Sequence, residues 1–185
     1  MSLVAFMDGS GLHFAENGHS EVVKLLIDYI ADMSAVLLFI LAVIPVLCLA
    51  GFSGHTEVVK LVIDNRADGN SSTYSGIMLL HAAARNIHTE MVKLLLNNKT
   101  NIDASDSEDG TMAVHVAALN GDTNIQKLLL LNKADMNASA HIGVTAVYIA
   151  AENGHTEVVK LLLDNKADVN ASCTKDGTTP PHAAT

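Results

Sequence analysis

The chain has 185 residues, of which 49% are hydrophobic and only 4% aromatic, and its formal net charge is −9 at pH 7. An acidic chain without a run of Lys or Arg is poorly suited to bind the phosphate backbone of nucleic acid or an anionic membrane surface, so we exclude the first partner and disfavour the second. The chain has two cysteines, Cys48 and Cys173.

One phrase recurs along the chain. Three full copies begin at Gly18, Gly54 and Gly154, and two diverged copies begin at Ile87 and Gly121. The starts are 36, 33, 34 and 33 residues apart, and a period near 33 predicts a stack of similar small units rather than one globule. Stacked units usually bind proteins and rarely catalyse reactions. The two cysteines fall in distant units, so we expect no disulfide and a reducing, cytoplasmic location.

Residues 35–52 form an apolar stretch that departs from this pattern. They read AVLLFILAVIPVLCLAGF, carry no charge, and reach the lower length limit for a membrane span. Three interpretations stay open. In the first, the stretch is an apolar loop followed by the first helix of a unit, because Leu47–Ala50 lie in register with the other repeats. In the second, the stretch is a membrane span, which Pro45 and the flanking repeats disfavour. In the third, the stretch is translated in a displaced reading frame.

The clearest unit runs over residues 143–170. Thr145 can cap a first helix over residues 146–152, and Thr156 can cap a second helix over residues 157–164. The turn-forming residues that follow end the unit. Neither helix is long enough to be stable alone, so each must bury its apolar face against a neighbouring unit.

These residues resemble the ankyrin repeat. The family pattern D-G-x-T-P, then G-H-x-E-V-V-K-L-L-L, then A-D-V-N-A is nearly reproduced by residues 176–180, 154–163 and 167–171. The resemblance implies an all-α solenoid of stacked helix-turn-helix units with projecting loops. It places residues 1–185 in one domain. The predicted repeats are 8–41, 42–74, 75–108, 109–141 and 142–175, with a partial repeat at 176–185.

The resemblance also implies where a partner binds, because family members recognise proteins through loop tips and the exposed faces of the first helices. The loop-tip candidates are Tyr74, Ile77, Glu108, Thr111, His141 and Val144. The first-helix candidates are Arg85, Asn86, Leu119, Asn120, Glu152 and Asn153. A further set of loop-tip candidates is Val36, Leu37, Leu38 and Phe39. An exposed apolar cluster at a loop tip indicates a contact or self-association surface.

Two departures from the family pattern predict a stack of modest stability. The loop glycine of the family is replaced by Arg66, Thr100, Lys133 and Lys166. A left-handed backbone at each of these sites costs roughly 1 kcal/mol. The last repeat stops inside its first helix, so we expect either a longer natural protein or end-to-end association through the uncapped C-terminal end.

No pattern in the sequence indicates catalysis, a cofactor or a metal. Eight of the nine histidines fall at the Leu-His or Gly-His place of the repeat, where the resemblance implies structural hydrogen bonds, and His141 alone is out of phase. Phosphate-binding loops, nucleophile motifs and Cys-x-x-Cys are missing from the sequence. Cys48 is predicted to be an inert core thiol.

We therefore predict a non-catalytic protein–protein interaction module that presents loop tips and first-helix faces to a partner protein. Two alternatives remain. One is a membrane-associated protein whose repeats form a cytosolic arm anchored through residues 35–52. The other is the regulatory repeats of a larger enzyme.

Overall fold

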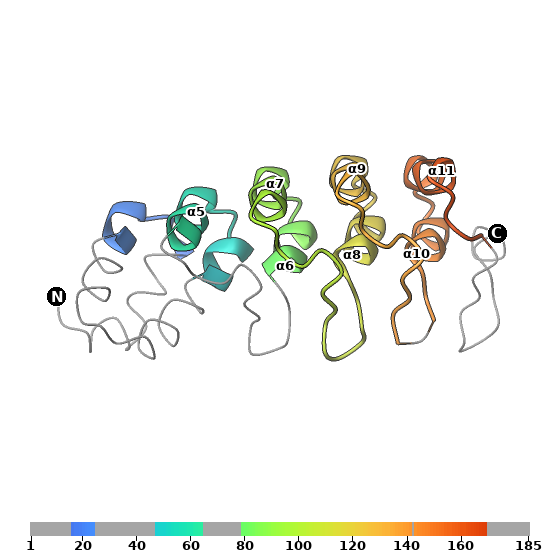
Figure 1. Ribbon diagram of the computed structural model, residues 1–185, viewed down its shortest axis with the longest axis horizontal. Coiled ribbons are helices and arrows are strands. Elements are labelled where there is room, and N and C mark those ends of the chain that lie inside the picture. The colour runs from blue at the N-terminus through green and yellow to red at the C-terminus, as the bar shows by residue number, and fades with distance from the viewer. Residues whose placement is uncertain (1–15, 25–46, 65–78, 142, 170–185) are drawn as a thin grey trace. The chain divides into compact units, whose positions relative to one another are not determined.

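The computed structural model describes residues 16–24, 47–64, 79–141 and 143–169, which form helices joined by turns and loops (Figure 1). The all-α prediction is confirmed for these residues. The chain divides into two compact units. The N-terminal unit comprises Met1–Tyr74 and Met78–Thr100, and the C-terminal unit comprises Ser75–Ile77 and Asn101–Thr185.

Three helices with defined bounds lie in the described part of the N-terminal unit. They are α5 (Thr56–Asp64), α6 (Leu79–Arg85) and α7 (Thr89–Asn97), and residues 47–52 are also helical. Helices α5 and α7 each begin with Thr-Glu, which places a carboxylate in the first turn, where the helix dipole favours negative charge. The apolar faces of α5 and α6 both pack against α7.

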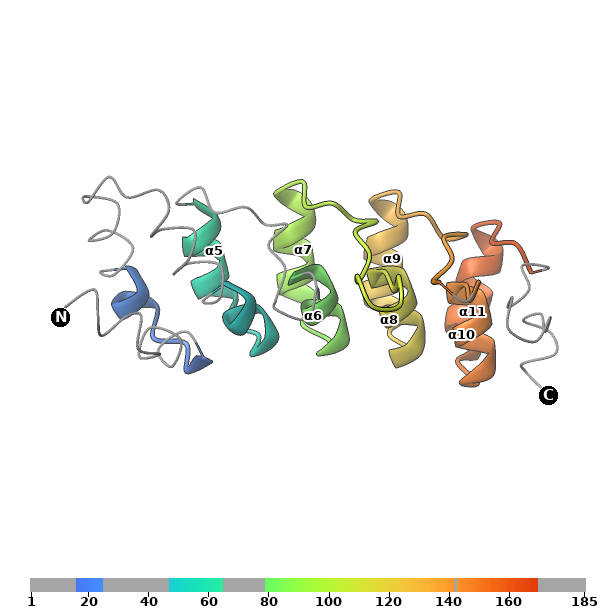
Figure 2. The ribbon, with the colours of Figure 1, turned by 90° about the horizontal axis from the view of Figure 1, so that it is seen from below.

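The described residues of the C-terminal unit form two helix pairs. Helices α8 (Ala113–Asn120) and α9 (Thr123–Leu131) form the first pair, and α10 (Ala146–Glu152) and α11 (Thr156–Asp164) form the second. Within this unit, α8 lies beside α10 in one layer and α9 beside α11 in a second layer (Figures 1 and 2). The loops before α8 and α10 project away from the layer of α9 and α11 (Figure 1). These are the projecting loops that the resemblance implies.

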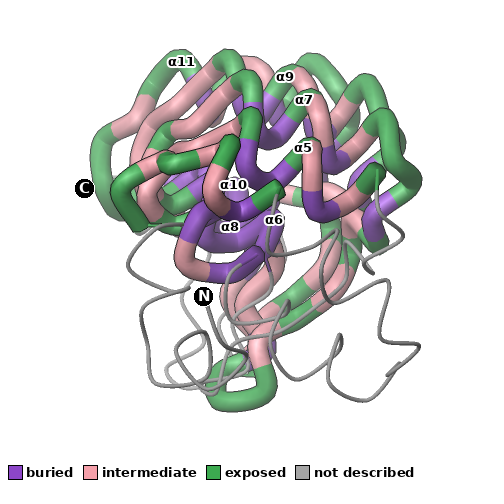
Figure 3. Tube along the Cα trace, turned by 90° about the vertical axis from the view of Figure 1, so that its left-hand side faces the viewer, coloured by how far each residue is buried: buried purple, intermediate pink, exposed green. Residues whose placement is uncertain are grey.

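The first helix of each pair is buried along most of its length. In α8 every residue from Ala113 to Ala118 is buried, and α6 and α10 are buried in the same way (Figure 3). Alanine is common in these helices, and its small side chain allows neighbouring helices to approach closely. The second helices bury one face and expose the other. A first helix can therefore meet a partner only at its ends.

The helix boundaries test the predicted caps. Helix α10 covers residues 146–152 as predicted, and the Thr145 hydroxyl accepts a hydrogen bond from the Tyr148 N–H at 3.4 Å. The prediction that Thr156 caps α11 is wrong. Thr156 is the first residue of that helix, and His155 is the cap residue, without a side-chain bond to the helix. The His155 side chain instead forms a hydrogen bond with the Leu119 carbonyl of the preceding repeat.

The left-handed positions confirm two of the predicted sites and correct one. Lys133 and Lys166 have φ of 67° and 69°. In the third repeat the left-handed residue is Lys99, with φ of 59°, and not Thr100. Thr100 is buried in the place that Ala134 holds in the next repeat, so the strained position lies one residue earlier. Arg66 lies outside the described residues.

The apolar stretch is described only at its C-terminal end. Residues 47–52 are helical, and Leu47, Cys48 and Ala50 are buried, as the repeat interpretation predicts. Residues 35–46 lie outside the described part of the chain. Among the described residues, every helix is too short or too polar to cross a membrane.

Candidate functional site

The loop before α8 ends in an acidic turn held by backbone and side-chain hydrogen bonds. The Asp106 N–H donates to the Thr111 carbonyl at 2.7 Å, and residues 105 and 112 pair as an isolated antiparallel bridge. Carboxylate oxygens of Asp106 and Asp109 accept the N–H groups of Glu108 and Thr111 at 2.7 and 2.9 Å. Gly110 adopts φ of 72° at the tip. The turn is therefore pre-formed, with the side chains at residues 107–109 exposed.

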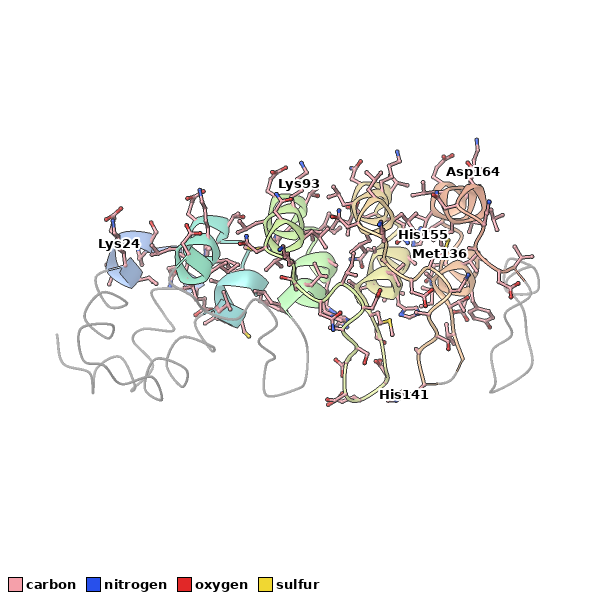
Figure 4. The ribbon with its side chains drawn as sticks, viewed as in Figure 1. Lys24, Lys93, Met136, His141, His155 and Asp164 are labelled. Carbon is pink, nitrogen blue, oxygen red and sulfur yellow. The ribbon has the colours of Figure 1, made fainter. Side chains whose placement is uncertain are left out.

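The loop before α10 braces the first one. The His141 N–H donates to the Asp109 carbonyl at 2.8 Å. The His141 ring lies over Gly110, where an added Cβ would be only 2.5 Å from ring atom Cδ2. Figure 4 shows His141 at the tip of the loops, on the far side of the unit from Asp164 on α11. The two loop tips therefore form one connected surface.

A buried histidine ties these loops to the helices. His115 Nδ1 accepts the Met112 N–H at 3.0 Å, and Nε2 lies 3.0 Å from the Ala138 carbonyl. Because Nδ1 is an acceptor, the proton resides on Nε2 and is donated to that carbonyl. The side chain is 1% exposed. The Leu-His place thus has the structural role that the resemblance implies.

Two histidines at the Gly-His place, His88 and His155, each link their repeat to the one before it. In the C-terminal unit, His155 Nε2 lies 2.9 Å from the Leu119 carbonyl, and its ring covers Gly121. In the N-terminal unit, His88 makes the same bond to the Phe52 carbonyl at 3.1 Å, and its ring covers Gly54. These bonds hold the C-terminal ends of α8 and of the helical residues 47–52, where Leu119 and Phe52 are exposed.

The predicted first-helix candidates divide by exposure. Leu119 is 51% exposed, and Arg85 and Glu152 are also exposed. The side-chain amides of Asn86 and Asn153 are committed to their own helices, because each donates to the carbonyl four residues earlier at 2.9 Å. Asn120 is half-buried. Side chains at the Leu119 place therefore present more available surface than the amides beside them.

The predicted loop-tip candidates divide in the same way. Glu108 and His141 are exposed, whereas Thr111 and Val144 are half-buried. The remaining candidates lie outside the described residues, and they are Val36, Leu37, Leu38, Phe39, Tyr74 and Ile77.

Four exposed large apolar side chains among the described residues lie outside the predicted set. Two of them, Leu131 and Leu163, lie on the second helices α9 and α11, and the other two are Phe52 and Ile87. Phe52 is 51% exposed and Ile87 is 52% exposed. Phe52 holds the same repeat position as Arg85 and Leu119, so the register of the repeats contains the signal that finds it. Ile87 replaces a glycine, and its exposure follows from its place in the tight turn between α6 and α7.

The outer side of the C-terminal unit carries a shallow hollow of about 250 Å³ between α9 and α11. Its lining residues are Thr123, Lys127, Glu157, Lys160, Leu161 and Asp164. Two cations and two anions balance there, so the hollow has no preference for a charged ligand.

The described residues hold no cluster of side chains that could bind a metal ion. No three His, Cys, Asp or Glu side chains among them lie close enough to share a metal ion. Burial raises the pKa of the Cys48 thiol to about 11, because the thiolate is poorly solvated there. This agrees with the prediction of an inert core thiol.

Comparison with protein families identifies the repeats. The family described as ankyrin repeats in three copies matches residues 47–140 and 114–185, which together exceed half of the chain. The family described as the ankyrin repeat matches residues 10–36. A comparison with curated proteins finds no match.

Proposed function

The chain belongs to the ankyrin-repeat family, and on that premise we propose that it is a non-catalytic module that binds a partner protein through its loop tips and first-helix ends. Ankyrin repeats are generally protein–protein interaction modules and are generally non-catalytic. A cytoplasmic location and a single repeat domain over residues 1–185 belong to the same proposal.

The observation that carries the proposal is the pre-formed surface of the C-terminal unit. The backbone of both loops is held by internal hydrogen bonds, and His141 joins them through the Asp109 carbonyl. The end of α8 is held by the bond from His155 to the Leu119 carbonyl. A partner that docks here orders few new groups, which lowers the entropic cost of association.

The outer face offers a matched control. The side chains of Lys160 and Asp164 line the hollow between α9 and α11. Figure 4 shows Asp164 on the far side of the unit from His141 at the loop tips. Substitutions there leave the candidate surface unchanged. If substitutions on the outer face and on the loop tips abolished partner binding equally, the cause would be a folding defect and not the loss of a binding surface.

Quantitative affinity capture from cell extract tests the proposal. Glu108→Lys and Leu119→Ser should each remove the proteins that the wild-type chain retains, and Lys160→Glu should retain them. Circular dichroism should show equal helix content in all variants, since each side chain is exposed. The proposal fails if the wild-type chain retains nothing above a resin control, or if only the Lys160→Glu variant loses its partners.

A further inference from the structure

One buried imidazole uses a ring nitrogen as a hydrogen-bond acceptor at the base of the loop before α8. His115 is the third residue of α8, and its Nδ1 accepts the Met112 N–H at 3.0 Å, as part of a capping box with that cap residue. The other ring nitrogen, Nε2, lies 3.0 Å from the Ala138 carbonyl, which can only accept. Only the neutral ring with its proton on Nε2 satisfies both bonds.

The two bonds of this ring hold the bases of both projecting loops. Met112 pairs with Ser105 across the first loop. Ala138 lies directly before the residue that pairs with Thr145 across the second loop. The tips of the loops are joined by a separate bond between backbone groups, which does not titrate. The bases of the two loops therefore depend on the protonation state of His115.

A second proton on the ring is incompatible with this arrangement. It would turn Nδ1 into a donor, so that the N–H groups of His115 and Met112 would face each other. The ring is 1% exposed, so the cation would also be separated from water. Histidine is the side chain whose ordinary titration falls between about pH 5 and 8. The ring can therefore become charged in mild acid only if the loop moves away from it.

The elements beside α8 in this unit supply no buried counter-ion from their described residues. Helix α8 has no other titratable side chain. The titratable residues of the loop before it are Asp103, Asp106, Glu108 and Asp109. Those of the loop before α10 are Lys133, Asp135 and His141. Those of α9 with its cap and of α10 are Asp122, Lys127, Tyr148 and Glu152.

Tyr148 is the only buried side chain in this set, and a phenol is neutral near pH 7. The buried ring therefore has no anion that would compensate a charge in the closed state. Carboxylates outnumber the cations on the two loops, and they favour the imidazolium once the loop has opened and admitted water. The surroundings therefore couple the charge on the ring to the opening of the loop.

We propose that His115 is a pH-sensitive switch, in which protonation releases the Met112 N–H and loosens the two loops that carry the candidate surface. This inference rests on the proposed function and names a regulation of the same surface. The Met112 bond is complete while the ring is neutral and is lost as the pH falls through the titration of the ring. A partner that requires the pre-formed loops is then released in acid.

Nuclear magnetic resonance of the ¹⁵N-labelled full chain tests the switch from about pH 8 to about pH 5. The Nδ1 chemical shift distinguishes an acceptor nitrogen from a protonated one. Amide exchange, corrected for its intrinsic dependence on pH, measures the Met112 bond. The Met112 amide should lose protection by about tenfold or more as Nδ1 gains its proton, the factor expected for one lost hydrogen bond.

His155 is the internal control in the same unit. Its Nε2 donates to the Leu119 carbonyl at 2.9 Å, and a second ring proton leaves this donor in place. The His155 backbone N–H donates to the Ala150 carbonyl at 2.8 Å and should keep its protection over the whole interval. Simultaneous loss at Met112 and His155 would mean acid unfolding of the unit and would reject a local switch.

His115→Gln is the matched variant. Glutamine at the third helical position supplies a capping-box acceptor that does not titrate, so its Met112 amide should stay protected throughout. Where this variant does not fold, the Met112 and His155 amides of the wild-type chain still decide. Met112 protection that persists after Nδ1 is protonated rejects the switch. An Nδ1 that stays unprotonated in the folded chain down to about pH 5 also rejects it.

Affinity capture at the two ends of this interval tests the consequence for binding. Proteins retained near pH 7 should leave the wild-type chain near pH 5 and remain on the His115→Gln variant. Retention by the wild-type chain after its loops have loosened would contradict the regulatory role. A wild-type chain that captures no protein near pH 7 would reject the proposed function, while the Met112 measurement on the chain alone would still stand.

Discussion

At the residue scale, the most informative departure is a polar side chain in the core. Gln126 on α9 is 0% exposed, and neither its Oε1 nor its Nε2 has a hydrogen-bond partner. The same repeat position holds Val59 in α5 and Val92 in α7, and both are fully buried. The amide has therefore been placed where the repeat normally packs an aliphatic group.

Gln126→Val should raise the free energy of unfolding by about 1–2 kcal/mol, because it removes an unsatisfied buried amide. Chemical denaturation followed by circular dichroism measures the change. The reciprocal variant Val92→Gln is the control and should lower stability by a similar or larger amount. Equal stability of Gln126→Val and wild type would show that the amide finds a partner in solution.

Cys48 makes a second prediction at this scale. Its folded-state pKa of about 11 exceeds the ordinary value of 9.0 because of burial. The unfolded thiol loses its proton more readily, so the stability contribution is complete below pH 9 and is lost as pH rises toward 11. Cys48→Ala should show a shallower fall in unfolding free energy over that interval. Parallel curves for the two proteins would contradict the assigned burial.

At the scale of elements, histidine rings join successive repeats. His155 reaches the Leu119 carbonyl, and its ring fills the space beside Gly121. Gly154 has nearly the same backbone, with φ of 71° against 68°, but nothing lies within 4 Å of an added Cβ. An alanine substitution at Gly154 therefore measures the cost of backbone strain alone. The same substitution at Gly121 adds the cost of displacing the His155 ring.

Gly154→Ala should lower stability by about 1 kcal/mol, the cost of a left-handed alanine. Gly121→Ala should cost more, because the new methyl group would lie 2.5 Å from His155 Nδ1 and force the ring off the Leu119 carbonyl. Thermal unfolding and the amide exchange rate at His155 measure the difference. Identical losses for the two variants would show that the ring contact contributes nothing.

At the scale of the whole molecule, the chain is two compact units, each with its own packed helices. Repeat stacks gain stability from neighbour-to-neighbour interfaces, so a core defect should act first within its own unit. Leu95 on α7 and Leu129 on α9 provide equivalent probes, since both are 0% exposed.

Leu129→Ala should cost about 2–5 kcal/mol locally, as the loss of a buried leucine does. Hydrogen exchange should accelerate in α8–α11 more than in α5–α7. Leu95→Ala should produce the opposite distribution. Uniform acceleration in both units from either variant would mean that the chain unfolds as one cooperative body.

Local sequence chemistry was enough to predict the helices and turns that repeat. The bounds of α10 and its Thr145 cap follow from side chains near in sequence. The left-handed Lys133 and Lys166 follow from the family resemblance, because the family has a glycine at these two sites. The same reasoning failed at Thr156 and Thr100. At Thr156 the preceding His155 ring bonds to the Leu119 carbonyl one repeat away, which the local pattern does not contain. At Thr100 the prediction was out of register by one residue, because Lys99 holds the left-handed position.

The sequence by itself determined the period, the all-α class and the family, because each copy of the phrase encodes the same helix pair in its own side chains. Only the tertiary structure decided that His88 reaches the Phe52 carbonyl, that His155 reaches the Leu119 carbonyl, and that Gln126 is buried without a hydrogen-bond partner. The two histidine bonds each join residues 36 positions apart. Such contacts exist only once the repeats have stacked.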